Sequence, residues 1–139
     1  MQKSKVKSQN YNSKFKKKVY IVGNTLASED SLPIKLLPRL KKLFPQHTFI
    51  EIDPNENFVP EECSIIIDNV HGIEEVKWFD TLDEFVITKS VSPHDYDLGF
   101  HLQMLKKLGK LKRFKILGIP IQANKVEIFQ QIKVALKSL

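Results

Sequence analysis

The chain has 139 residues, 42% of them hydrophobic, which fits a single domain with a substantial core. No run approaches the ~18 apolar residues of a membrane helix, and no signal-peptide pattern opens the sequence, so we expect a cytoplasmic protein that does not contact the membrane. The single cysteine, Cys63, excludes an internal disulfide and fits a reducing compartment. We expect it to be a buried small residue rather than a nucleophile.

The net charge of +6 is unevenly distributed. Residues 1–18 hold seven lysines and no acidic residue, residues 19–100 hold six basic against fifteen acidic residues, and residues 101–139 hold nine against one. Because the lysine-rich segment has little apolar surface to bury, we predict a disordered basic tail over residues 1–17 and a single domain over residues 18–139. The tail is interpreted either as a solvating extension or as an electrostatic arm for nucleic acid or an acidic partner.

Apolar runs that are typical of strands alternate with helical periodicities along the domain. The predicted strands cover residues 18–22, 48–52, 63–68 and 114–119. Predicted helices cover residues 31–44, 92–109 and 125–139. This alternation predicts an α/β fold, a three-layer αβα sandwich with a mainly parallel central sheet.

Three features of these elements are specific enough to be tested. Pro38 should kink or split the first helix because it removes a backbone donor. Residues 76–79 and 84–88 are predicted as short strands with a helical turn between them. Leu108 and Val134 are assigned to the core-facing sides of their helices, whereas His47 is expected at the surface.

Polar residues occur where predicted strands meet predicted helices. Asp68 closes the apolar run Ser-Ile-Ile-Ile-Asp, and a carboxylate is costly to bury, so it should emerge at the carboxyl edge of the sheet. His94 follows Ser92-Pro93 at a helix start, where a neutral imidazole is favoured. Asp30 has an equally ordinary interpretation as a helix cap. Two carboxylates and one imidazole could together hold a divalent metal ion.

In their order and residue types these segments resemble motifs of the hydrogenase maturation endopeptidases, which remove a C-terminal extension from the large subunit of nickel–iron hydrogenases. The family pattern is a strand ending in Gly-Asn, an acidic pair, a mid-chain strand ending in Asp, and a His before a later helix. The matching residues are Gly23-Asn24, Glu29-Asp30, Asp68 and His94. Asp30, Asp68 and His94 would then be the catalytic and metal-binding residues, with Glu29, Asn24 and His71 as secondary candidates.

The resemblance also implies a partner and a metal. The partner would be the large-subunit precursor, which carries the recognised Ni²⁺; another divalent ion such as Zn²⁺ is the alternative, and we expect a monomer. The chain departs from the family pattern at Ser31-Leu32-Pro33, at Asn69 and in the glycine-free loop 53–62. These departures leave a divergent subgroup or a non-catalytic homologue as open interpretations.

A small basic nucleic-acid-binding module is the interpretation from a different class. Residues 105–115 are rich in lysine and, with the N-terminal tail, could contact phosphates. No aromatic-interleaved RNA-recognition motif accompanies them, so nucleic acid is the less favoured partner. The sequence also lacks a Gly-x-Ser-x-Gly elbow, a P-loop, a Gly-x-Gly-x-x-Gly turn and a His-Glu-x-x-His motif.

Overall fold

The computed structural model describes residues 16–22, 32–53, 58–70, 72–79, 81–89, 98–121 and 124–139. Within these residues the strands are β1 (Lys18–Val22), β2 (Thr48–Ile52), β3 (Ser64–Val70), β4 (Lys77–Phe79) and β5 (Phe114–Pro120). The helices are α2 (Leu32–Leu43), α3 (Leu82–Lys89), α4 (Leu98–Lys107) and α5 (Lys125–Lys137). No helix of the described part is long and apolar enough to cross a bilayer.

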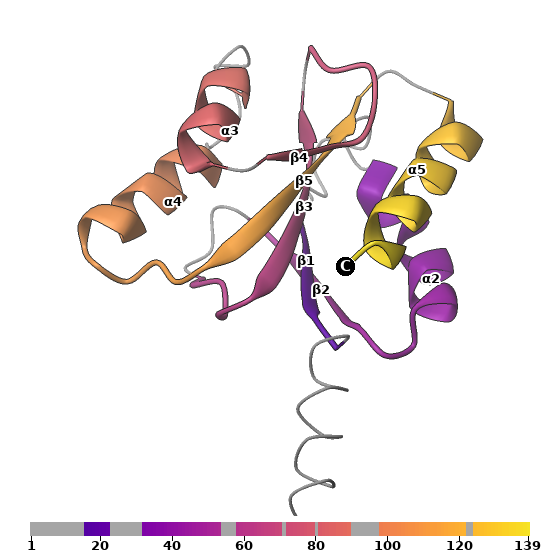
Figure 1. Cartoon of the computed structure of the whole chain (residues 1–139), viewed down its shortest axis with the longest axis horizontal. Coiled ribbons are helices and arrows are strands. Elements are labelled where there is room, and N and C mark those ends of the chain that lie inside the picture. The colour runs from indigo at the N-terminus through magenta and orange to yellow at the C-terminus, as the bar shows by residue number, and fades with distance from the viewer. Residues whose placement is uncertain are drawn as a thin grey trace, which may run out of the picture.

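The strands form one sheet in the order β2-β1-β3-β5-β4 (Figure 1). β1 pairs in parallel with β2 and β3, and β3 pairs in parallel with β5. Only β4, at one edge of the described sheet, runs antiparallel to its neighbour β5. The predicted mainly parallel sheet is therefore confirmed.

Helices cover both faces of this sheet (Figure 1). On one face α2 and α5 pack against alternate residues of the central strands, including Ile65 and Ile67 of β3. On the other face α3 and α4 pack against the intervening residues, including Ile66 and Val70. Because β3 is covered on both sides, it is a nearly continuous apolar strand, as is typical of parallel sheets. The three-layer αβα fold is confirmed.

The end of α4 is fixed by a glycine, as the sequence predicts. Gly109 has φ +72°, which a residue without a side chain adopts readily. Its N–H donates to the Lys106 carbonyl (3.1 Å), and the Lys110 N–H donates to the Leu105 carbonyl (2.9 Å). These two bonds form a Schellman motif that stops the helix and directs the chain toward β5.

Two predicted elements are wrong in type or length. Residues 84–88 belong to α3 rather than to a strand, because Thr81 Oγ1 accepts a hydrogen bond from the Glu84 N–H (3.1 Å) and starts a helix that buries Phe85. β3 continues two residues beyond Asp68, because Asn69 and Val70 still pair with β5. Of the kink or split predicted at Pro38, the split does not occur, because α2 continues as one helix through this residue.

Three side chains expected in the interior lie outside it. Leu108 is 60% exposed, because it falls in the turn after α4. The buried residues of α5 are Ile128, Ile132 and Leu136, which are four residues apart. Val134 lies on the outer side of the helix and is 66% exposed. Cys63 is exposed and has φ +63°, at the turn that precedes β3.

Residues 1–15 of the predicted tail lie outside the described part of the chain. Lys17 is described, and its backbone is held beside the start of β2. Its N–H donates to His47 Nδ1 (3.0 Å), and its carbonyl accepts a hydrogen bond from the Thr48 N–H (2.9 Å). Within the described residues, Lys17 is thus joined by two hydrogen bonds to the segment that begins β2.

Candidate functional site

Asp68 is the only predicted site residue that lies in the described part of the chain. It stands in β3, the middle strand of the sheet, between β1 and β5. Since side chains alternate along a strand, Asp68 shares the face of Ile66 and Val70, which α3 and α4 cover. The residue is only 3% exposed, whereas the sequence predicts a carboxylate emerging at the edge. An Asp at this depth is uncommon in a protein interior.

The space beside Asp68 is made by a glycine on the neighbouring strand. Asp68 is in register with Gly118 of β5. A methyl group on Gly118 would come within 2.5 Å of Phe79 Cε2 and 3.1 Å of Val70 Cγ2. Gly118 therefore lets the ring of Phe79, from β4, lie close against the sheet at the level of Asp68.

The connections that follow β1 and β3 lead to opposite faces of the sheet, and Asp68 stands in β3. From the carboxyl end of β1 the chain enters α2 on one face of the sheet, whereas from β3 it passes through β4 to α3 and α4 on the other face (Figure 1). Neighbouring strands whose connections leave toward opposite faces form a topological switch point. In open α/β sheets ligands bind in the crevice outside the carboxyl ends of such strands.

The other predicted site residues are Asn24, Glu29, Asp30, His71 and His94, and all lie outside the described residues. Their convergence on Asp68 therefore stays a prediction. Among the residues that are described, no three His, Cys, Asp or Glu side chains lie together in a group that could hold a metal ion. Only one residue of the predicted triad, Asp68, is among these described residues, so the triad stays a prediction.

His101 is a buried polar residue of α4 that sequence reasoning did not assign to a role. It is 3% exposed, and its Nε2 lies 2.7 Å from the carbonyl oxygen of Phe58. The carbonyl can only accept, so Nε2 carries the proton. The imidazole also stacks on the Phe58 ring at 5.3 Å between centroids, and Phe58 in turn contacts the Tyr20 ring of β1. His101 thus holds the segment before β3 against the sheet.

His47 is buried, contrary to the surface position expected from the sequence. Its ring stacks on Phe44 (5.8 Å between centroids) and meets Phe49 edge-on (6.3 Å). Burial lowers the pKa of the His47 imidazole below its ordinary value, and the positive charge of Lys17 lowers this pKa further. His47 lies between the end of α2 and the start of β2, so it stabilises the fold rather than the candidate site.

Comparisons with known proteins assign no function to the chain. No protein-family model matches the sequence, and no curated protein is found as its relative. A similar solved structure is the crystal structure of an uncharacterized protein from Wolinella succinogenes. The two chains share 17% sequence identity over 88% of this chain and 92% of the other, with a TM-score of 0.49.

Proposed function

We propose that this protein is a maturation endopeptidase that cleaves the C-terminal extension of a nickel–iron hydrogenase large-subunit precursor and recognises the nickel that the precursor carries. The observation that carries the proposal is the position of Asp68, a buried carboxylate in the central strand at the switch point of a parallel sheet. A carboxylate is uncommon at this depth in a protein interior, and it stands in a strand whose carboxyl end adjoins the crevice where open α/β sheets bind ligands.

The sequence around the same edge of the sheet supports this proposal. The segment with Asn24, Glu29 and Asp30 begins directly after Val22, the last residue of β1, and β1 is the neighbour of β3. His94 precedes the first residue of α4, Leu98, by four positions. Asn24, Glu29 and Asp30 thus follow β1, which pairs directly with β3. His94 precedes α4, which packs on one face of β3.

The proposed cleavage requires only a small set of metal-binding side chains at this site. Carboxylate oxygens and a neutral imidazole are suitable ligands for Ni²⁺ or Zn²⁺ and would approach the precursor's metal through Asp30, Asp68 and His94. A divalent ion bound there polarises the scissile carbonyl or supplies an activated water. Asp68 would hold its position with little side-chain freedom, because the strand on which it stands is paired on both sides.

The outer side of α4 offers a surface for the precursor protein. Phe100, Met104 and Leu108 recur at intervals of four residues and are 58%, 39% and 60% exposed. Exposed Lys106 and Lys107 lie in the same segment, so an apolar surface with acidic neighbours would fit here. The stripe follows the segment of His94 in sequence and would place a bound precursor close to the candidate site.

The test is cleavage of a nickel-loaded precursor by purified variants. Asp68→Asn and His94→Ala should each lower the cleavage rate by about a hundredfold or more, the usual range for a group that takes part in the chemistry. Asp83→Asn is the matched control, because Asp83 is an exposed residue at the first turn of α3. Circular dichroism verifies that each variant is folded.

Two outcomes would reject the peptidase. Full cleavage by folded Asp68→Asn removes the observation on which the proposal depends. A wild-type protein that binds the loaded precursor without cutting it would instead identify a non-catalytic homologue. Nickel affinity of the wild type should also fall as the pH is lowered, because an imidazole binds the ion only when it is unprotonated, and His94→Ala should weaken it.

A further inference from the structure

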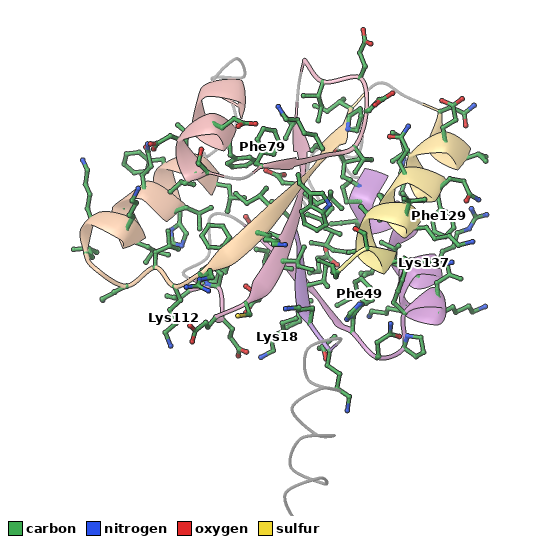
Figure 2. The ribbon with its side chains drawn as sticks, in the orientation of Figure 1. Lys18, Phe49, Phe79, Lys112, Phe129 and Lys137 are labelled. Atoms are coloured by element: carbon green, nitrogen blue, oxygen red, sulfur yellow. The ribbon has the colours of Figure 1, made fainter. Side chains whose placement is uncertain are left out.

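A pocket lies at the end of the sheet opposite the candidate site. It has a volume of about 440 Å³ and is formed where β3 and β5 begin and α5 ends. Figure 2 shows the same end of the molecule, with Lys18 and Lys112 labelled near the start of the strands. The volume falls in the range of small-molecule sites. Because this pocket adjoins the amino ends of the strands, it is separate from the edge occupied by Asp68.

The pocket is strongly positive. Lys17, Arg113 and Lys115 line it, and no acidic side chain of the described residues does so. None of the three cations forms a salt bridge within the described part of the chain. A terminal carboxylate on Leu139, counted against them, would still leave two positive charges in excess. Unpaired cations around a hollow attract an anion.

The remaining walls are apolar. Ile65, Phe114 and Leu139 line the same space, and an adjoining hollow of about 460 Å³ continues past Lys115 to Trp78. The Lys115 ammonium lies 5.7 Å from the centroid of the Trp78 ring. A small inorganic anion would satisfy the cations but would leave these walls in contact with water. The occupant should therefore have both an acid group and an apolar body.

We propose that this pocket binds an organic carboxylate with an apolar or aromatic body, held by Arg113 and Lys115. The arginine fork pairs two N–H donors with the two carboxylate oxygens. The apolar part lies against Ile65 and Leu139. This assignment does not depend on the proposed peptidase activity, because it uses none of the residues of that site.

The single cysteine makes the test direct. Cys63 is exposed, lines the pocket and is the only thiol in the chain, so its rate of labelling by a maleimide reports occupancy. The probe is N-acetylphenylalanine, and its uncharged amide is the matched ligand control. We expect the acid to slow labelling saturably and the amide to have little effect. Isothermal titration of the same pair measures the affinity independently of the thiol.

Variants identify the residues responsible. Arg113→Gln should weaken binding of the acid by about tenfold, as the loss of a charge-assisted hydrogen bond implies. Lys115→Gln should also weaken it, whereas Lys41→Gln, at an exposed position of α2, should leave it unchanged. Unfolding curves establish that each variant is folded.

Three results would overturn the proposal. The first is an absence of both protection and binding heat with the acid at millimolar concentration. The second is equal protection by inorganic phosphate, which would show that the apolar walls add nothing. The third is stronger protection by a single-stranded oligonucleotide, which would assign this end of the molecule to nucleic acid.

Discussion

Asp68 and Gly118 stand opposite each other in the pairing of β3 with β5, and the glycine leaves its side of the sheet to the ring of Phe79. Phe79 comes from β4 and contacts Phe85 of α3 edge-on, with 5.5 Å between ring centroids. The packing of the edge strand β4, the packing of α3 and the surroundings of Asp68 therefore all depend on the absence of a side chain at Gly118. Packing at Gly118 and chemistry at Asp68 should respond to the same substitution.

Gly118→Ala should lower the free energy of unfolding by about 1–3 kcal/mol, the usual range for overpacking a core. The added methyl group would overlap Phe79, and that ring has little room to move because it is buried against Phe85. Urea denaturation measures the change. In the double variant Gly118→Ala/Phe79→Leu part of the loss should be recovered. Strictly additive effects would show that Phe79 is not the group that the methyl meets.

His101→Ala should lower the unfolding free energy because it leaves the Phe58 carbonyl without its donor and removes the stacked ring. An unsatisfied buried carbonyl alone has a cost of about 1–3 kcal/mol. The Glu61 N–H, which donates to the Tyr20 hydroxyl (3.3 Å), should also exchange faster with solvent. His101→Gln is the control, since its amide can still donate. Equal losses for both variants would contradict the role of the hydrogen bond.

Stability should depend on pH through His47. Its pKa is lowered in the folded state, so between that pKa and the unfolded value of about 6.5 the unfolded chain binds more protons. The contribution of His47 is therefore complete above about pH 6.5 and decreases as the pH falls toward the folded-state pKa. Urea midpoints measured from about pH 7.5 to pH 5 give the slope. His47→Asn, which keeps an acceptor for the Lys17 N–H, should flatten it; an unchanged slope would assign the effect to other groups.

Phe100→Glu should reduce cleavage of the hydrogenase precursor mainly by raising KM, because it places a charge in the exposed apolar stripe of α4. Val134→Glu is the matched control, since Val134 is equally exposed but belongs to α5 on the other face of the sheet. Cleavage rates at several precursor concentrations separate an effect on KM from an effect on kcat. Equal effects of the two substitutions would argue against docking on α4.

The strands and helices that carry strong patterns could be predicted from the sequence. The apolar runs at β1, β2, β3 and β5 appear almost where expected, because strands that contribute to a core covered by helices are rich in apolar and β-branched residues. Residues 84–88 could not be assigned in the same way. Their β-branched residues favour a strand locally, but the Thr81 cap and the burial of Phe85 against Phe79 favour a helix.

The depth of Asp68 could not be predicted either. A single sequence shows that a carboxylate follows three isoleucines, but not that β5 offers partners to the next two residues as well. The sequence likewise gives no sign of the pocket at the amino ends of the strands, because its walls come from β3, β5 and α5, which are distant along the chain. The predicted triad joins residues from three such segments, and only Asp68 lies in the described part of the chain.

The pairing of β3 with β5 has a consequence for how the protein is made. β3 is buried along its whole length, yet one of its two neighbours begins only at Phe114, about fifty residues further along the chain. While a ribosome is still adding that intervening stretch, the isoleucines of β3 have only β1 beside them. Nascent chains should therefore be prone to aggregation and depend on chaperones until residues 114–137 emerge. The core then closes late and cooperatively rather than growing with each element as it is synthesised.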